Sequence, residues 1–329
     1  MPPDADAFWV LRPGVGELRA GPIRDPGPDE VLVRTLHTGI SRGTESLVFR
    51  GAIPQREYDR MRAPFQEGDF PGPLKYGYLN VGLVEDGPEH LCGRTVFCLY
   101  PHQDRYVVPA TAVTLVPDGV PAARAVLAGT LETAVNLAWD ARPWIGMRIA
   151  VVGAGMVGAC VARLLAGLPG TEVTLVDVDP SRADVAAALG VDFALPADAP
   201  SHRDLVVHAS ATGAGLQLSL ELLAGEGTVW DLSWYGDREI RLDLGGSFHS
   251  QRQAIRASQV GRVAASVRSR RTSAERLALA LELLADPAYD AIITSRSSFA
   301  ELPAVLSKMA GGHWPGLCHV VDYEDHEVR

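Results

Sequence analysis

Residues 148–167 read RIAVVGAGMVGACVARLLAG, in which a glycine-rich turn joins an apolar run to a helical pattern. Gly153, Gly155 and Gly158 form the pattern G-x-G-x-x-G. A second apolar run then ends at the acidic residue Asp177, about 20 residues beyond the last glycine. Strand, glycines, helix, strand and acid in this order are typical of a dinucleotide-binding site.

Each glycine of this motif has a physical role. Gly153 permits the tight turn out of the strand, Gly155 lets the backbone approach a pyrophosphate, and Gly158 lets the helix pack closely on the sheet. The helix would begin at Met156 and Val157, where free N–H groups and the positive end of the helix dipole attract phosphates. We therefore expect these five residues to bind a dinucleotide.

The acidic residue bears on which dinucleotide is bound. Asp177 would accept hydrogen bonds from the adenosine ribose and would repel a 2′-phosphate, so it favours NAD(H). NADP(H) stays possible because Arg182 lies nearby in the sequence. The alternative, an ordinary strand-to-helix turn, accounts for the glycines but not for the acid that follows them.

Composition limits the classes of function. The chain has 329 residues, enough for two domains, and 47% hydrophobic with 21% charged residues is typical of a globular protein. Its formal charge of −10 argues against a nucleic-acid binder, since phosphate backbones require clustered Lys and Arg. The longest apolar run is shorter than the roughly 20 residues that span a bilayer, so no membrane partner is expected.

The cysteines and the N-terminus point to the cell interior. None of the four cysteines forms a C-x-x-C pair, and free thiols are the plain interpretation of their spacing. No basic stretch followed by an apolar run is visible at the N-terminus. We expect a soluble, cytoplasmic protein.

Two types of pattern divide the chain. Up to about residue 120 the sequence predicts short strands broken by Pro and Gly, and from Arg148 strands and helices alternate, as in a doubly wound parallel sheet. A helix is expected from Thr130, with that residue as its N-cap. The C-terminal part of the chain, from about residue 265, does not continue this alternation of strands and helices, so we assign it to the first domain. The predicted fold class is α/β, with a β-rich catalytic domain at 1–120 and 265–329 and a Rossmann domain at 121–264.

This order of domains resembles the medium-chain dehydrogenase/reductase superfamily, whose first domain is similar to the GroES barrel. The residues that carry the resemblance are 30–45 (EVLVRTLHTGISRGTE), 76–85 (YGYLNVGLVE), 129–134 (GTLETA) and the glycine motif with Asp177. Within the superfamily, the segments SRGTES, PLKYGY, SWYG and SFHSQRQ look most like the branch of bacteriochlorophyllide a dehydrogenase and threonine-dehydrogenase-like proteins. The resemblance covers nearly the whole chain and implies hydride transfer to or from a nicotinamide.

The sequence departs from the zinc-dependent members of that superfamily. Their metal ligands are Cys, His and a further Cys or Glu, and the matching positions here fall on Ser41 or Arg42, on Tyr78 and near Gly129. Zn²⁺ prefers thiolate, imidazole or carboxylate ligands, which these residues do not supply. We therefore expect neither a catalytic nor a structural zinc ion.

Without a metal, a side chain must supply the proton. Tyr78 is the first candidate, and Lys75 is a candidate partner because a nearby cation lowers the pKa of a phenol. The alternative is that Tyr78 only packs in the wall of the β-domain. Thr44 and Glu45 match the family's hydroxyl-plus-acid step, which can relay protons, although turn formation or capping explains them nearly as well.

Several further residues are weaker candidates. Glu132 is a possible acid or base, but a Glu in the first turn of a helix is favourable for dipole reasons alone. His249 could serve as an acid or base near neutral pH, and it could equally be an ordinary surface histidine. Three more residues are expected to contact the cofactor: Thr133 at the nicotinamide, Arg42 at the pyrophosphate, and Ser210.

The function that follows is a zinc-independent, NAD(H)-preferring oxidoreductase that interconverts a secondary alcohol and a ketone on a small, ring-bearing substrate. Trp230, Trp234 and Tyr235 are candidates for an aromatic pocket wall, although packing in the core is the default expectation. One alternative is a quinone or enone reductase, because those branches also lack zinc. Another is a non-catalytic NAD-binding sensor or scaffold. The resemblance also implies a homodimer.

Overall fold

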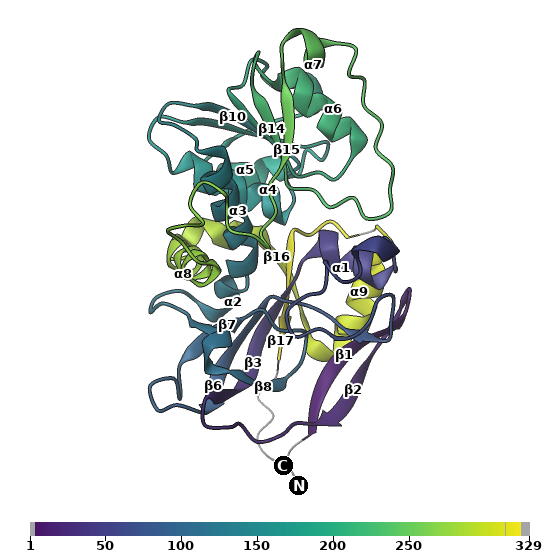
Figure 1. Ribbon diagram of the computed structural model, residues 1–329, viewed down its shortest axis with the longest axis vertical. Helices are drawn as coiled ribbons and strands as arrows, with labels where there is room; N and C mark the ends of the chain where they lie inside the picture. The colour runs from purple at the N-terminus through teal and green to yellow at the C-terminus, as the bar shows by residue number, and fades with distance from the viewer. Residues whose placement is uncertain (1–3, 313, 324–329) are drawn as a thin grey trace. The chain divides into compact units, whose positions relative to one another are not determined.

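The computed structural model describes residues 4–312 and 314–323, and it divides into two compact units. Unit 1 comprises Met1–Gly129, Leu281–Ala285 and Ile293–Arg329, and unit 2 comprises Thr130–Ala280 and Asp286–Ile292. Both units combine strands with helices (Figure 1), and among the described residues only unit 2 contains an all-parallel sheet. The predicted α/β class is confirmed.

The sheet of unit 2 has six parallel strands in the order β12-β11-β10-β13-β14-β15. The strands are β10 (Arg148–Val152), β11 (Glu172–Val176), β12 (Asp192–Ala194), β13 (Leu205–His208), β14 (Thr228–Asp231) and β15 (Ala254–Ala257). Chain order runs outward in one direction from β10 and in the other from β13. The two central neighbours β10 and β13 therefore form the switch point at which open α/β sheets bind ligands.

Helices cover this sheet because its strands are apolar on both faces. The main helices are α4 (Met156–Ala166), α5 (Arg182–Ala188) and α6 (Gly213–Leu222), and α7 (Ser247–Ser250) is a single turn. Helix α6 buries Leu216 and Leu220 against Val152 and Val206 of the central strands. This apolar layer fixes where the strand ends and their loops lie.

Unit 1 contains a seven-stranded sheet with the order β16-β17-β3-β6-β7-β9 and with β8 paired to β3. These strands are β3 (Glu30–Ile40), β6 (Asn80–Asp86), β7 (Thr95–Cys98), β8 (Arg105–Pro109), β9 (Val113–Leu115), β16 (Ile293–Ser298) and β17 (Cys318–Asp322). Strands β8 and β17 share one edge of β3, while β6 occupies the other edge. The C-terminal strands thus join the N-terminal part of the chain, as the tail's departure from the alternating pattern suggested.

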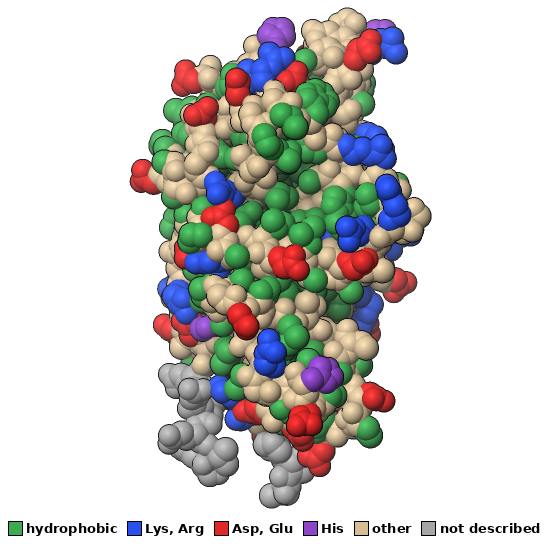
Figure 2. Space-filling view, turned by 90° about the vertical axis from the view of Figure 1, so that its left-hand side faces the viewer, with side chains coloured by type: hydrophobic (Ala, Val, Ile, Leu, Met, Phe, Trp, Pro, Cys, Tyr) green, Lys and Arg blue, Asp and Glu red, His purple; other side chains and the backbone are tan. Residues whose placement is uncertain are grey.

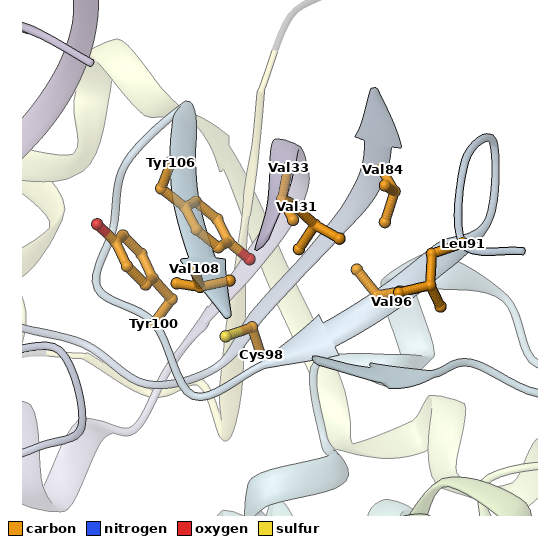
Figure 3. Packing of buried hydrophobic residues seen from close by; sticks show 9 residues of the cluster. All are labelled: Val31, Val33, Val84, Leu91, Val96, Cys98, Tyr100, Tyr106 and Val108. Carbon is orange, nitrogen blue, oxygen red and sulfur yellow. The ribbon is translucent and has the colours of Figure 1, made fainter. Parts of the chain in front are cut away.

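A second sheet of unit 1 has the order β2-β1-β5-β4. Its strands are β1 (Asp4–Arg12), β2 (Val15–Pro22), β4 (Glu67–Gly68) and β5 (Leu74–Lys75), and the helices of this unit are α1 (Arg42–Phe49), α2 (Ala122–Ala125) and α9 (Leu302–Ala310). The core beside β3 contains Val33, Val96 and the stacked rings of Tyr100 and Tyr106 (Figure 3).

Two expectations about helices need revision. Helix α3 spans Ala128–Ala141, so Thr130 lies inside the helix and is not its N-cap. Helix α8 spans Ser273–Leu283, and its residues up to Ala280 group with unit 2, not with the β-rich domain expected to resume at 265. Within unit 2, Arg276 of α8 forms a buried ion pair with Glu132 of α3.

The surface and the helices carry two further observations. On the face shown in Figure 2, basic and acidic side chains alternate among apolar ones and do not gather into one basic area. Within residues 4–312 and 314–323, no helix is both long and apolar enough to cross a bilayer.

Candidate functional site

The glycine-rich loop of unit 2 has the geometry expected of a phosphate cradle. Gly153 adopts φ +109°, and a Cβ there would lie 2.6 Å from the Ser210 backbone nitrogen. A Cβ on Gly158 would lie 1.9 Å from the Gly153 carbonyl oxygen, so α4 approaches the strand too closely for any side chain. Gly155 differs, because a Cβ there would meet nothing within 4 Å. The backbone at Gly155 therefore faces open space that another molecule can enter.

Helix α4 begins at this open position. Gly155 is its N-cap, with no side-chain cap, and Met156 and Val157 form the first turn. First-turn N–H groups have no partner within their own helix, and they point outward along the helix axis toward an incoming anion. The tight turn at Gly153 and the close helix packing at Gly158 are as predicted, and the dinucleotide contacts at Gly155 and the helix start stay a prediction.

Asp177 follows β11 and stabilises the loop directly. Its Oδ2 accepts a hydrogen bond from the Ala154 N–H at 2.7 Å, and its Oδ1 accepts one from the Asp179 N–H at 3.0 Å. A carboxylate offers about four lone-pair positions, so acceptor capacity is left for a ribose diol. Arg182 pairs with Asp179 at 3.2 Å, which engages the guanidinium at the start of α5.

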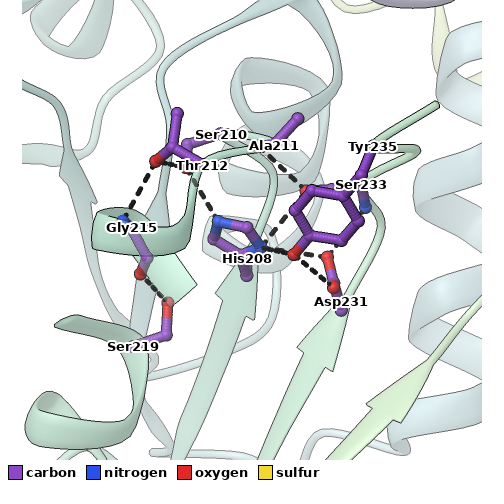
Figure 4. Close-up of polar contacts among 9 residues, drawn as sticks. All are labelled: His208, Ser210, Ala211, Thr212, Gly215, Ser219, Asp231, Ser233 and Tyr235. Atoms are coloured by element: carbon purple, nitrogen blue, oxygen red, sulfur yellow. Dashed lines mark hydrogen bonds and ion pairs between the residues drawn. The ribbon is translucent and has the colours of Figure 1, made fainter. Parts of the chain in front are cut away.

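A polar network occupies the carboxyl ends of β13 and β14 (Figure 4). His208 Nε2 lies 2.7 Å from Ser210 Oγ, and His208 Nδ1 lies 2.9 Å from Asp231 Oδ1. The Tyr235 hydroxyl donates to Asp231 Oδ2 at 2.7 Å. The network continues from Ser210 to Thr212, whose hydroxyl caps α6. It holds the two loops that follow these strands at the switch point.

Burial and hydrogen bonding shape the charge of this network. Burial alone would raise the pKa of Asp231, but hydrogen bonds from His208, Tyr235 and the Ser233 N–H together lower it. Burial and the neighbouring Asp231 carboxylate raise the pKa of Tyr235. An ionised Asp231 beside a protonated Tyr235 is the expected state at neutral pH. Sequence reasoning found Ser210 but missed His208 and Asp231, and the one available signal was a His and an Asp ending adjacent strands.

Glu132 and Thr133 lie on α3 in unit 2. Glu132 is buried and pairs with Arg276 Nη2 at 2.9 Å, while Arg276 also donates to Asn136 and to the Val260 carbonyl. Burial raises the pKa of Glu132 against the opposing effect of the Arg276 guanidinium. This arrangement favours a structural role for Glu132 over an acid–base role. Thr133 is half-buried on the same helix.

His249 and the aromatic candidates lie in the later part of unit 2. His249 is exposed on the short helix α7, and Trp230 is buried on β14 with the Arg256 guanidinium 4.7 Å from its ring. Tyr235 belongs to the His208 network, because its hydroxyl donates a hydrogen bond to Asp231.

Unit 1 contains a second polar cluster, which is buried. Glu45 and His102 are 4% and 1% exposed, and Glu45 Oε2 lies 2.8 Å from His102 Nε2. The other oxygen of Glu45 accepts a hydrogen bond from the Ser41 N–H at 2.8 Å, and His102 Nδ1 lies 2.7 Å from the Thr38 hydroxyl. All polar groups of this Glu–His pair are thus engaged, as buried polar groups must be. The sequence gives no local signal for this pair, because His102 and Glu45 lie 57 positions apart.

Tyr78 lies beside this cluster. Burial and the Glu45 charge raise the pKa of Tyr78 to about 12, while hydrogen bonds with the hydroxyls of Ser41 and Thr44 act in the opposite direction. A phenol with such a pKa keeps its proton at neutral pH. The structure therefore brings Tyr78 and Thr44 together, and Tyr78 is a neutral phenol at neutral pH.

The expected pairing of Lys75 with Tyr78 is wrong. Lys75 forms an ion pair with Glu67, donates to Gln103, and lies 5.5 Å from the centre of the Tyr100 ring. The groups that shift the pKa of Tyr78 do not include Lys75. Sequence proximity misleads here because Lys75 belongs to the short strand β5, whose pairing with β1 and β4 directs its side chain toward Glu67.

Arg42 begins α1 in unit 1. Its guanidinium donates to the Trp314 carbonyl at 2.9 Å and to the Gly316 carbonyl at 3.5 Å. Arg42 is exposed, and these contacts attach the start of α1 to the segment before β17. They supply a structural reason for an arginine at this position.

The donor set at the expected zinc position does not suit a metal. Ser41 and Tyr78 lie together there, and both are neutral groups hydrogen-bonded within the cluster. The nearby carboxylate of Glu45 already binds the Ser41 N–H and His102. Over the described part of the chain, no three His, Cys, Asp or Glu side chains are grouped so as to hold a metal ion.

Comparison with known proteins reveals similarity of fold only. No protein-family model and no curated protein matches the chain. Among solved structures, L-idonate 5-dehydrogenase from Escherichia coli is 14% identical with a TM-score of 0.79, covering 98% of this chain and 99% of its own. Acetophenone reductase from Geotrichum candidum, in complex with NAD, is 18% identical with a TM-score of 0.76, covering 100% and 99%. A protein described as a zinc-binding dehydrogenase from Sinorhizobium meliloti, bound to NADP, is 17% identical with a TM-score of 0.78, covering 97% and 99%.

Proposed function

We propose that this chain, which shares the fold of these dehydrogenase structures, is a nicotinamide-dependent oxidoreductase that interconverts a secondary alcohol and a ketone. The observation that carries the proposal is the glycine-rich loop of unit 2. It has open space at Gly155, an uncapped helix start, and an acid bonded to the same loop. The fold similarity supports a dinucleotide at this position, since solved structures of this fold contain NAD, NADH or NADP.

We propose NAD(H) as the preferred cofactor. The Asp177 carboxylate accepts a hydrogen bond from the Ala154 N–H of the glycine-rich loop. The Arg182 guanidinium forms an ion pair with Asp179. A carboxylate favours a free ribose diol and repels a 2′-phosphate. The neighbouring Val178 is 79% exposed and offers an apolar surface on which a base can pack.

The chemistry that the cofactor supplies is hydride transfer, and the protein has to provide binding, orientation and a proton. In the proposed reaction Tyr78 donates the proton to the oxygen of the reduced carbonyl. Its raised pKa keeps the proton available, and the hydroxyls of Ser41 and Thr44 offer a route for replacing it. We propose that the reaction proceeds without zinc, because the donor set at Ser41 and Tyr78 does not fit that ion.

The test of cofactor binding is calorimetry of the full chain with NAD⁺ and with NADP⁺. We expect NAD⁺ to bind at least about tenfold more tightly, and Asp177→Asn to reduce that preference because the charge is lost. Asp198→Asn, which alters an exposed acid in the same unit, serves as the matched control. Failure of either dinucleotide to bind would refute the proposal.

The test of activity follows nicotinamide absorbance with secondary alcohols, ketones and enones, with and without a chelator. Turnover of alcohols and ketones that survives chelation supports the proposal. Turnover of enones alone would instead identify a C=C reductase. That alternative also fits a site without zinc ligands. Binding without turnover of any substrate would indicate a sensor or scaffold, and near-stoichiometric zinc in the purified protein would contradict zinc independence.

A further inference from the structure

We propose that unit 1 contains a binding site for a small carboxylate with an apolar body, formed around the buried ammonium of Lys75. A pocket of about 380 Å³ lies there, within the range of about 300–1,000 Å³ in which proteins bind small molecules. The site lies wholly within unit 1, and it includes neither the glycine loop nor Tyr78. The inference therefore does not depend on the proposed oxidoreductase function.

The strand register builds the wall of this pocket. Trp9 of β1 pairs with Lys75 of β5, and Lys75 pairs in turn with Glu67 of β4. Residues at alternate positions of a strand share one face, so Ala5 and Ala7 lie on the same face as Trp9. All five of these residues line the pocket. The two alanines present only methyl groups, and this is why space remains in front of the sheet.

Lys75 is a buried lysine in the lining of this pocket, which is unusual for a charged residue. Its side chain is only 5% exposed, and the chain uses lysine at just one other position, Lys308. A buried ammonium requires a charged or hydrogen-bonding partner, because desolvation is costly. Lys75 has three such groups: the Glu67 carboxylate, the Gln103 side-chain oxygen and the face of the Tyr100 ring.

The carboxylate partner of Lys75 is the exchangeable part of this arrangement. Glu67 is 55% exposed and belongs to a two-residue edge strand, whereas Lys75 and Gln103 are buried. Because Glu67 is well solvated and Lys75 is not, the carboxylate of a ligand can take the place of Glu67 only by keeping the buried ammonium paired. The protein already shows with its own Glu67 that a carboxylate is the group that Lys75 binds.

The remaining lining defines the rest of the ligand. Tyr100 and Tyr106 stack with their ring centres 3.8 Å apart, and Figure 3 shows them side by side in the adjoining core. The Tyr100 hydroxyl has no hydrogen-bond partner within the described residues, so it is available to a ligand oxygen. The indole of Trp9 supplies an apolar surface. These groups suit a flat or compact apolar body that carries a single carboxylate.

Each positive charge at the pocket has a carboxylate as its partner. Three cations, Arg19, Arg24 and Lys75, line it, and each pairs with one carboxylate: Arg19 with Glu17, Arg24 with Glu30, and Lys75 with Glu67. The protein as a whole carries a formal charge of −10, whereas the charges around this pocket balance pair by pair. An anionic ligand that displaces the Glu67 carboxylate keeps this balance, because it leaves Lys75 paired.

The experiment is calorimetric titration of the full chain with benzoate, and with benzamide as its neutral isostere. We expect saturable binding of benzoate and at least about tenfold weaker binding of benzamide. Lys75→Met should weaken benzoate by at least about tenfold, whereas the matched change at the exposed lysine, Lys308→Met, should leave it unchanged. Equal affinity for benzoate and benzamide, or an unchanged affinity in Lys75→Met, overturns the proposal.

A second variant keeps the proposal testable if Lys75→Met does not fold. Glu67→Gln removes the competing carboxylate and retains Lys75, so benzoate should bind several-fold more tightly than it does to the unaltered chain. Unchanged or weaker binding overturns the proposal. None of these variants should alter the affinity for NAD⁺, so failure of this inference is distinguishable from failure of the proposed function.

Discussion

The polar sites of the two units are built from different parts of the polypeptide. In unit 2 the candidate cofactor loop is made largely of backbone groups at Gly153, Gly155 and Gly158, with Asp177 as its main side chain. In unit 1 the cluster around Glu45 is made of side chains that the sheet and α1 bring together. A backbone-built site depends on the space at a few positions, whereas a side-chain site depends on hydrogen-bond partners and burial.

The largest effect should come from the closest backbone contact in unit 2. Gly158→Ala places a Cβ 1.9 Å from the Gly153 carbonyl oxygen, so α4 has to move away from the strand. We expect the free energy of unfolding to fall by about 3 kcal/mol or more, as measured by urea denaturation. Gly155→Ala is the matched control, because its Cβ meets nothing within 4 Å. That variant should stay folded and lose affinity for NAD⁺, and equal destabilisation of both variants would contradict the comparison.

A substitution at Glu132 shows whether this buried residue of unit 2 stabilises the fold or transfers a proton. Glu132→Gln leaves the buried Arg276 guanidinium without its carboxylate partner. We expect a loss of about 3 kcal/mol in the free energy of unfolding, and turnover per folded molecule should be unchanged. A large fall in kcat with unchanged stability would instead assign Glu132 to proton transfer.

Tyr78 tests the side-chain site of unit 1. Tyr78→Phe removes the proposed donor, and kcat for carbonyl reduction should fall by about 100-fold. Tyr76→Phe is the control, because Tyr76 is a buried tyrosine whose ring meets that of Tyr78 edge-on. Because the pKa of Tyr78 is about 12, the rate should show no loss from its ionisation at neutral or mildly alkaline pH. Equal turnover in the unaltered chain and in Tyr78→Phe would exclude this tyrosine from the chemistry.

The smallest effect concerns the acid at the end of β14. The pKa of Asp231 is lowered in the folded protein from its ordinary value of 3.8, so the ionised form stabilises the fold above that pH. This contribution is lost as the pH falls through the folded-state pKa. The difference in unfolding free energy between the unaltered chain and Asp231→Asn should be about 1 kcal/mol near pH 7 and should shrink below pH 4, as followed by urea denaturation. A difference that is independent of pH would show that the charge of Asp231 does not matter.

Much of unit 2 was predictable because its signals are local. The strand, glycine turn and helix at 148–167 are encoded within 20 consecutive residues, and the parallel sheet follows from the alternation of such segments. The end of each element was less predictable, and α3 begins two residues before Thr130. The role of Glu132 was also hidden, because Arg276, its partner, lies 144 positions away.

What the sequence by itself determined is the α/β class, the cradle of three glycines and the acid that follows, since backbone conformation and short-range spacing decide these features. Only the tertiary structure decided that Lys75 binds Glu67 and not Tyr78, that Glu45 meets His102, and that His208 joins Asp231 and Ser210. The physical reason is that a side chain's partners depend on strand register and burial. Both are set by pairing across the sheet, often between residues far apart in the chain.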